Sequence, residues 1–461
     1  MNASLAGEIR ALVAEDLASE VGARLRGDDR KEFARQCIFE HFDALTGSDD
    51  AHGAPIGGSS DEQAVAQSVL DALFGMGGLQ SLIDDDDIEN IDINGCDRVW
   101  ATFADGSKQL MPPVAGSDDE LIDLVRSAAG RFGLSERRFD LARPELDLRL
   151  PDGSRLSALM AVTARPVVSI RRHRYADLTL DDLVGLGTLD TDLAALLGAA
   201  VRSRKNVVVS GAMNSGKTTL LRALAAEIPP RERVVTIEQA FELGLDSAPH
   251  RHPDLVALEA RPPNVEGEGL ISVADLVRRA LRMNADRVIV GEVLGDEVLP
   301  MLNAMSQGRS GSMCTIHADS SAGVFRRIAS YAVQAPERLP LEASNLLVAG
   351  AVHFVVHLDS DMHDAADDAD DDRSVDGAGP ARRHEAPDHR RFPSRTSRQR
   401  FVSSVREVVD AEGPHVVSNE IFEPGPDRRA RPAAPLRAQT QRELDRVGSG
   451  PFRMPAVGYR A

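Results

Sequence analysis

The central part of the chain alternates short apolar runs with longer segments in which apolar residues recur every three or four positions. The runs are rich in β-branched residues, which favours buried strands, and the spacing between them predicts helices. Strands that alternate with helices are typical of an α/β fold with a largely parallel sheet. We therefore expect an α/β domain over residues 206–358, with strands at NVVVS, RVVTIE, RVIVGE, GSMCTIH and HFVVHL.

The preceding residues show two other patterns. In 1–62, apolar positions at helical spacing are followed by a Gly/Ser/Asp-rich stretch, which predicts a helical N-terminal extension and a linker. Residues 63–173 begin with a further helical pattern and continue with alternating strands and turns at Asp105-Gly106 and Asp152-Gly153, which predicts an α+β domain. Residues 174–205 are expected to be a linker and a leading helix.

The C-terminal part is more polar. Residues 359–400 contain few apolar side chains and many charges of both signs, so they are predicted to be a disordered insertion. Residues 401–425 again resemble paired strands and are expected to complete the α/β domain. The Arg- and Pro-rich residues 426–461 are predicted to be a disordered tail.

Composition narrows the classes of function. The 461 residues include 72 acidic and 53 basic side chains, and the net charge of -19 disfavours a surface built for nucleic acid. Three widely spaced cysteines indicate neither a disulfide framework nor a zinc site. The N-terminus lacks the pattern of a secretory signal, and the longest apolar run, 345–358, is shorter than the roughly 18 residues that span a bilayer. We expect a reducing compartment and a membrane association only through a partner.

One motif predicts the chemistry most directly. The stretch from Gly211 to Thr218 matches G-x-x-x-x-G-K-[ST] between a predicted strand and a predicted helix. Its backbone N–H groups would surround a nucleotide's phosphates, Lys217 would reach the β- and γ-oxygens, and the Thr218 hydroxyl would bind Mg²⁺. The residues expected to contact the nucleotide here are Gly211, Ala212, Met213, Asn214, Ser215, Gly216, Lys217, Thr218 and Thr219.

Four further residues follow predicted strands. Glu292 ends RVIVGE, where the carboxyl edge of such a sheet forms sites, and Gly291 stands where an aspartate is usual. Glu238 and Glu242 are four residues apart near another strand end and could lie on one side of a short helix, beside a Mg²⁺ ion. His317 follows GSMCTI. Each also has a structural interpretation: a solvated acid, a helix cap or a structural histidine.

Together with the phosphate loop, these residues form four sequence elements. Their order along the chain resembles that of the secretion ATPase superfamily of type II and type IV secretion systems. The phosphate loop, the T-I-E acids, the G-E strand end and the T-I-H strand end correspond to its phosphate loop, Asp box, glutamate-ending Walker B and His box. The segments LEARPPNVEGEG, LVRRALRMNADRVIVGEVLGDE and MLNAMSQGRSGSMCTIHADS are most similar to the CpaF-like branch, which drives Flp (tight adherence) pilus assembly. The resemblance covers about residues 88–356.

This resemblance implies a RecA-like P-loop NTPase domain in a homohexamer, with ATP and Mg²⁺ bound between that domain and the preceding one. By motif position, Glu292 would be the catalytic glutamate and His317 a sensor of the γ-phosphate. Glu238, and with it Glu242, would act around the metal. Arg155 and Arg171 of the preceding domain would reach the phosphates, as arginines that offset transition-state charge do; the alternative is that they are ordinary surface arginines on strands.

Three positions depart from the family's pattern. Gln239 replaces the last acid of the usual T-I-E-D, Leu294 replaces the arginine of G-E-V-R-G, and Asn284 replaces an arginine in L-R-M-R-P-D. Because Lys217, Glu292 and His317 are present, we expect hydrolysis to survive these changes.

The sequence thus predicts a cytoplasmic hexameric ATPase, peripheral to the inner face of the cell membrane, that moves an inner-membrane platform protein to assemble a pilus or secrete protein. A type IV secretion or conjugation motor is the alternative within the superfamily. Two other classes remain: a nucleic-acid translocase, against which the acidic balance and the few Trp and Tyr residues argue, and a nucleotide-binding scaffold that has lost hydrolysis.

Overall fold

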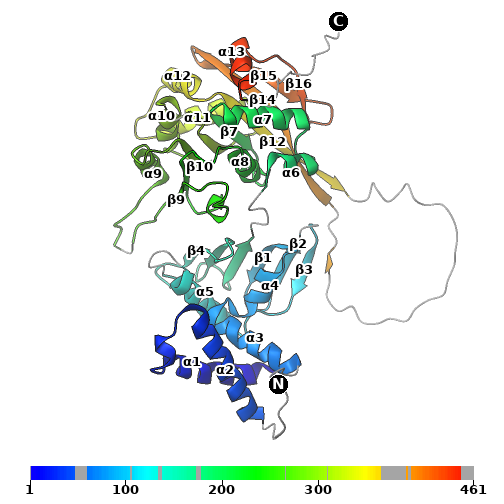
Figure 1. Ribbon diagram of the computed structural model, residues 1–461, viewed down its shortest axis with the longest axis vertical. Helices are drawn as coiled ribbons and strands as arrows, with labels where there is room; N and C mark the ends of the chain where they lie inside the picture. The colour runs from blue at the N-terminus through cyan, green and yellow to red at the C-terminus, as the bar shows by residue number, and fades with distance from the viewer. Residues whose placement is uncertain are drawn as a thin grey trace, which may run out of the picture. The chain divides into compact units, whose positions relative to one another are not determined.

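The computed structural model describes residues 2–46, 60–103, 106–132, 138–172, 178–264, 266–308, 310–364, 391–392 and 396–447. The chain divides into two compact units (Figure 1). Unit 1 comprises residues 1–174 and 374–394, and unit 2 comprises residues 175–373 and 395–461.

Unit 1 begins with three helices, α1 (Asn2–Ala18), α2 (Gly27–Thr46) and α3 (Ser60–Phe74), with a 3₁₀ turn at Gly22–Arg24. Ile9, Val13, Ile38 and Val69 are buried between them. The predicted helical extension is therefore present. Its boundary at residue 62 is wrong, because α3 starts at Ser60 and shares the core of α1 and α2.

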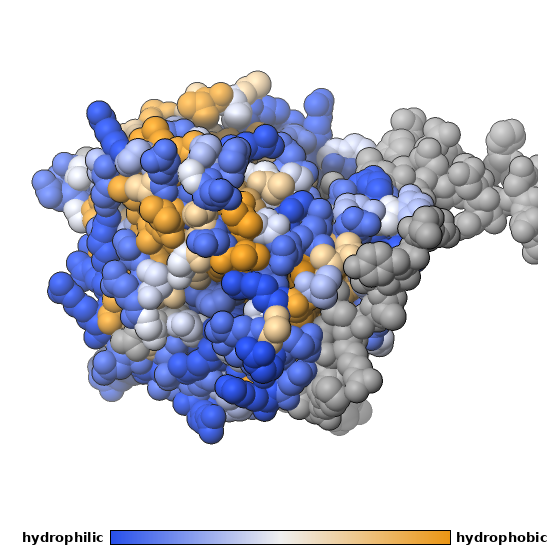
Figure 2. Space-filling model, turned by 90° about the horizontal axis from the view of Figure 1, so that it is seen from above, coloured by the Kyte–Doolittle hydropathy of each residue, from blue (hydrophilic) through white to orange (hydrophobic). Residues whose placement is uncertain are grey.

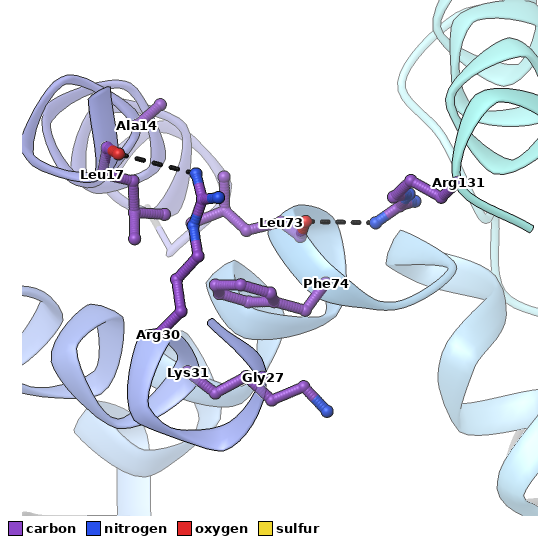
Figure 3. A pocket seen from close by; sticks show the side chains of 8 residues that line it. All are labelled: Ala14, Leu17, Gly27, Arg30, Lys31, Leu73, Phe74 and Arg131. Carbon is purple, nitrogen blue, oxygen red and sulfur yellow. Dashed lines mark hydrogen bonds between the residues drawn. The ribbon is translucent and has the colours of Figure 1, made fainter. Parts of the chain in front are cut away.

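Two arginines fix the ends of these helices beside a cavity of about 490 Å³ (Figure 3). Arg30 points to the carbonyl oxygen of Leu17, 3.5 Å away, and Arg131 donates to the carbonyl oxygen of Leu73 at 3.1 Å. Both carbonyls belong to the last turn of a helix, where backbone acceptors lack intrahelical donors. The two guanidinium groups therefore cap the C-terminal ends of α1 and α3.

The rest of unit 1 is an antiparallel sheet with helices, as predicted for an α+β domain. The strand order is β13-β3-β2-β1-β6-β5-β4. A 3₁₀ turn (Gly77–Leu79), α4 (Gln80–Asp84) and α5 (Asp118–Phe132) accompany it, and one apolar core includes Leu82, Leu121 and Val125 with the inward side chains of the strands. The strands are β1 (Ile88–Asn94), β2 (Val99–Phe103), β3 (Lys108–Met111), β4 (Glu145–Arg149), β5 (Arg155–Leu159), β6 (Val167–Arg171) and β13 (Arg391–Phe392).

Unit 2 has a nine-stranded sheet in the order β16-β15-β14-β12-β7-β11-β10-β8-β9. The pairs from β12 to β9 are parallel, and those from β12 to β16 are antiparallel. The predicted α/β class is confirmed, and β9 is a strand that the sequence pattern did not predict. The strands are β7 (Val207–Gly211), β8 (Val234–Glu238), β9 (Leu255–Glu259), β10 (Arg287–Val293), β11 (Met313–His317), β12 (Phe354–Asp364), β14 (Thr396–Glu412), β15 (His415–Pro424) and β16 (Ala430–Pro432).

Helices cover both faces of this sheet (Figure 1). One core contains α6 (Leu180–Gly185), α7 (Thr191–Arg202) and α8 (Lys217–Ala225), and the other contains α9 (Val273–Ala280), α10 (Val298–Ser306), α11 (Gly323–Gln334) and α12 (Leu341–Ala351). A 3₁₀ turn spans Leu245–Ser247. Because α6 and α7 bury leucines in the first core, the segment predicted as a linker with a leading helix is part of unit 2 itself.

The C-terminal predictions need two corrections. Both ends of the segment predicted to be disordered are strands: β12 continues to Asp364, and β14 starts at Thr396 and pairs with it. Arg391 and Phe392 pair with β3. Residues 365–390 and 393–395 lie outside the described residues. The predicted tail contains β16 and helix α13 (Ala438–Asp445), where Leu444 is fully buried. Residues 448–461 are not described.

The surface of unit 2 is partly apolar. Figure 2 shows apolar side chains gathered on the side seen from above. Large exposed apolar side chains of α11, α12 and β15 include Val333, Leu341, Leu346 and Val417. No helix within the described residues is long and apolar enough to cross a lipid bilayer.

Candidate functional site

The phosphate loop connects the end of β7 to the start of α8. Gly211 has φ 151°, and a Cβ atom there would lie 2.5 Å from the carbonyl oxygen of Leu358, so only glycine fits. Asn214 and Gly216 have left-handed φ angles of 58° and 92°, and Lys217 begins the helix. Since glycine and asparagine tolerate positive φ, these residue types produce the turn that brings the loop back to the helix N-terminus.

The loop has features that fit a phosphate group. Ala212, Met213 and Asn214 are exposed, whereas Ser215 and Lys217 are buried. The Ser215 hydroxyl is buried without a hydrogen-bond partner among the described residues. A buried unpaired hydroxyl is costly, and phosphate oxygens would satisfy it together with the N–H groups at the helix N-terminus. The residues present therefore fit a bound nucleotide phosphate.

A hydrogen-bonded chain leads from this loop to the neighbouring strands. The Lys217 ammonium lies 2.7 Å from the Ala212 carbonyl oxygen and 3.1 Å from His317 Nδ1. His317 Nε2 lies 2.5 Å from Glu292 Oε1. An ammonium group has only donors, so Nδ1 accepts and Nε2–H donates to the glutamate. The structure thus brings together three predicted residues in the order Lys217, His317, Glu292.

A β-bulge directs Glu292 toward this chain. The pairing of β10 with β11 shifts between Val290 and Val293, where Gly291 and Glu292 lie. The Thr315 hydroxyl donates to the Gly291 carbonyl oxygen at 2.6 Å and fixes the irregular strand. Bulges turn side chains away from their regular direction and are common beside active sites. The Glu292 side chain retains 37% of its exposed area and so remains reachable by water.

Glu238 has a different environment, although it also ends a strand. Its side chain is buried, and Oε1 accepts the backbone N–H groups of Glu242 at 2.8 Å and Leu243 at 2.7 Å. Burial raises the pKa of Glu238 to about 7, against the opposing effect of these two hydrogen bonds. A Cβ atom at Gly291 would lie 2.9 Å from Glu238 Cγ. The missing side chain at Gly291 therefore makes room for Glu238.

The short helix predicted for Glu238 and Glu242 is absent. Residues 239–244 form an irregular segment, and Glu242 contributes its backbone: its N–H donates to Glu238, and its carbonyl oxygen accepts from Arg222. The two carboxylates therefore do not share a helix face. Within the described part of the chain, no group of three or more His, Cys, Asp or Glu side chains could hold a metal ion.

The partly exposed Thr218 lies in the first turn of α8. A Mg²⁺ ion bound by one hydroxyl, phosphate oxygens and water needs no cage of protein ligands. The local chemistry is therefore compatible with Mg²⁺ at Thr218.

The three departures from the family's pattern lie outside the Lys217–His317–Glu292 chain. Gln239, Asn284 and Leu294 are all exposed. Asn284 has φ 54°, a conformation that asparagine tolerates better than arginine. The Leu294 backbone N–H donates to Glu297.

Arg155 and Arg171 belong to unit 1 and stand directly opposite each other on β5 and β6. Arg149 on β4 stands opposite Arg155, so three arginines form one row across three strands. Like charges in opposed positions are unfavourable unless an anion or acid offsets them. Sequence reasoning missed Arg149, although the Asp152-Gly153 turn predicts the pairing of residues 149 and 155.

Arg400 is a second residue that sequence reasoning missed. It lies on β14, in the segment predicted to be disordered, and its Nε–H donates to the Asn214 carbonyl oxygen at 3.0 Å. No short sequence motif connects positions 214 and 400. Only the pairing of β12 with β14 places them together.

Comparison with known proteins identifies relatives over most of the chain. A family profile described as "Type II/IV secretion system protein" matches residues 75–411. A putative conjugal transfer protein of Mycobacterium tuberculosis is 37% identical over 298 residues, which cover 63% of this chain and 81% of that protein. The type IV secretion system protein VirB11 of Brucella suis is 28% identical and covers 66% and 90% of the two chains. The crystal structure of the VirB11 ATPase from Brucella suis with sulphate aligns with a TM-score of 0.33 and 27% identity, over 67% of this chain and 94% of that one.

Proposed function

The chain belongs to the family of type II/IV secretion system proteins, and we propose that it is a Mg²⁺-dependent ATPase that powers Flp (tight adherence) pilus assembly or a related secretion machine. The observation that carries this proposal is the hydrogen-bonded connection from Lys217 through His317 to Glu292. It places a lysine suited to phosphate binding and a water-accessible carboxylate beside the same loop, and hydrolysis at a phosphate uses groups of both kinds.

In this proposal each residue has a separate task. The backbone N–H groups of the loop and Lys217 bind the phosphates, and Thr218 holds Mg²⁺, which neutralises charge on the phosphate oxygens when it is bound. Glu292 orients a water molecule and accepts its proton, while the N–H of His317 keeps the carboxylate in place. Lys217 now donates to loop carbonyls and to His317. Drawing it toward phosphate oxygens would release His317 Nδ1 and so report nucleotide binding to Glu292.

Glu238 takes a supporting part. Its burial, its two backbone hydrogen bonds and its raised pKa favour a role in holding residues 239–243 rather than in binding metal directly. Glu242 lies on the segment held in this way, and in this proposal its carboxylate would act near the metal through water.

The assembly that we propose is a homohexamer in the cytoplasm, attached to the inner face of the cell membrane through an inner-membrane platform protein. Family membership supports it, and so does the arginine row of unit 1. Arg155 and Arg171, with Arg149, would offset phosphate charge when the domains close on a nucleotide. Cycles of closing and opening would then move the platform protein.

A second candidate within the family is a type IV secretion or conjugation motor. It is favoured by the 37% identity to a protein named as a putative conjugal transfer protein. The genes that flank this one would separate the two: pilin and platform genes would support pilus assembly, and mating-pair or relaxase genes would support conjugation.

Phosphate release from ATP by the purified full chain tests the proposal. We expect Mg²⁺-dependent hydrolysis that Lys217→Ala abolishes. If the wild type does not exceed Lys217→Ala, even as a hexamer with lipid or its platform partner, the protein is a nucleotide-binding scaffold instead. Stimulation of hydrolysis by DNA would indicate a nucleic-acid translocase.

A further inference from the structure

A two-stranded ribbon passes beside the phosphate loop. β12 pairs with β7 from Phe354 to Leu358. Leu358 is opposite Gly211, the last residue of β7. Its pairing with β14 continues to Asp364. The ribbon, residues 359–364 with 396–401, therefore extends past the end of the sheet at the place where the phosphate loop begins (Figure 1).

Arg400 connects this ribbon to the middle of the loop. Its Nε–H donates to the carbonyl oxygen of Asn214 at 3.0 Å, and its Cδ atom lies 3.3 Å from the point where a Cβ atom at Gly216 would stand. Asn214 is exposed and has a left-handed φ of 58°. Arg400 thus holds the loop at a residue with left-handed backbone.

The backbone that carries Arg400 is itself anchored. Arg428 pairs with Asp359 and Asp361 of the opposite ribbon strand, at 2.5 Å from each. Arg429 lies 4.9 Å from the ring of Phe401, the neighbour of Arg400, and Phe401 is buried. The ribbon therefore holds Arg400 in a defined position.

Arg400 contacts one peptide group, the one between Asn214 and Ser215. In a trans peptide the carbonyl and the following N–H point in opposite directions. The carbonyl of Asn214 faces Arg400, so the N–H of Ser215 points into the loop, where it makes a long 3.4 Å bond to the Ala212 carbonyl oxygen. A charged donor on the carbonyl polarises the peptide and strengthens its N–H as a donor.

We propose that Arg400 is a positioning residue of the nucleotide site, which orients the Asn214–Ser215 peptide so that its N–H group binds a phosphate. The inference rests on the proposed function, since it requires a nucleotide in the loop. It also gives the ribbon a role: a movement of residues 359–364 and 396–401 would change the affinity of the phosphate loop.

Equilibrium binding to the full chain tests this role, with a fluorescent N-methylanthraniloyl-ADP as probe and inorganic pyrophosphate as its competitor, both with Mg²⁺. For Arg400→Ala we expect about tenfold weaker binding of both ligands, the loss that corresponds to one charge-assisted hydrogen bond. Arg400→Lys should lose less, because it keeps a positive donor. Arg442→Ala, an exposed arginine of α13, is the matched control and should bind as the wild type does.

The two ligands separate positioning from other effects. Unchanged affinities in Arg400→Ala would overturn the proposal, and so would weaker binding of the fluorescent ADP alone, because a residue that acts through the loop must affect both ligands. If Arg400→Ala does not fold, the same comparison is made with Arg400→Gln and Arg400→Lys. Absence of binding by the wild type, or binding unaffected by Lys217→Ala, would contradict the proposed function rather than the role of Arg400.

Discussion

Glu238 is the last residue of β8, and Glu292 is the last but one of β10. The two strands are neighbours in one sheet, yet the surroundings of the two glutamates differ. Glu292 lies on a bulge, keeps 37% of its exposed area and accepts from His317. Glu238 is 4% exposed, accepts two backbone N–H groups and has its pKa raised to about 7 by burial. In our proposal Glu292 acts on water near the phosphate loop, and Glu238 holds a segment of chain.

The difference shows that a carboxylate at the edge of a parallel sheet is not by itself evidence of catalysis. What distinguishes Glu292 is its connection to Lys217 through His317. Breaking that connection should reduce turnover, whereas disturbing Glu238 should mainly change stability.

Among the residues around Glu292, a large effect on turnover is expected from His317→Ala. Without the imidazole, Glu292 loses the donor that orients it, and turnover should fall about 10- to 100-fold, as it does when a reacting group is displaced by about 1 Å. Steady-state phosphate release measures the change. His317→Gln is the matched control: its amide can still donate to Glu292 and accept from Lys217, so it should recover part of the rate. Equal losses in both variants would contradict the orienting role.

The variant Glu238→Gln tests the surroundings of the buried glutamate through the pH dependence of the unfolding free energy. The pKa of Glu238 rises from 4.5 to about 7 on folding, so the folded state holds the proton more tightly than the unfolded chain. Its contribution to stability is complete below pH 4.5 and is lost as the pH rises through 7. Glutamine stays neutral and keeps an acceptor for the two N–H groups.

Relative to Glu238→Gln, the wild type should therefore lose up to about 3 kcal/mol of unfolding free energy between pH 4.5 and pH 8. Urea denaturation at several pH values measures the difference. Parallel pH profiles of the two proteins would show that Glu238 is not held protonated in the folded state.

The smallest effect is expected for Gly291→Ala. The new methyl group would stand 2.9 Å from Glu238 Cγ, so the glutamate side chain must shift. Overpacking of this kind costs about 1 kcal/mol, and urea denaturation detects it. In a Glu238→Ala background the cost should disappear, because the three atoms nearest to the methyl group all belong to the Glu238 side chain. If the cost persists in the Glu238→Ala background, the strain does not come from a collision with the Glu238 side chain.

Sequence patterns predicted the strands β7, β8, β10, β11 and β12 because each contains a short apolar run with β-branched residues, as in NVVVS and RVIVGE. They predicted the paired strands of residues 401–425 as well, but failed in residues 359–400 and 426–461, where the apolar signal is sparse. Helix α13 is held by the buried Leu444 and by ion pairs with distant residues, Lys205–Glu443 among them. The ribbon at residues 359–364 is likewise held by Arg428. Such contacts join residues far apart in the chain and leave no local periodicity.

Prediction of the functional site from the sequence has the same limit. The phosphate loop, Glu292 and His317 each follow a strand, and parallel strands bring their ends together, so their proximity could be predicted. Arg400 reaches the loop from a strand nearly two hundred residues later, through a register that no motif encodes. The burial of Glu238 could not be predicted from the sequence either, because it depends on the space left by Gly291 on the adjacent strand.

The most direct test of the central claim is single-turnover hydrolysis of ATP by Glu292→Gln and Glu238→Gln, measured side by side at pH 8 with nucleotide binding verified for each. We expect that Glu292→Gln binds ATP and hydrolyses it at least about 100-fold more slowly than the wild type, while Glu238→Gln stays within about threefold. Unchanged turnover in Glu292→Gln, or the larger loss in Glu238→Gln, would contradict that claim.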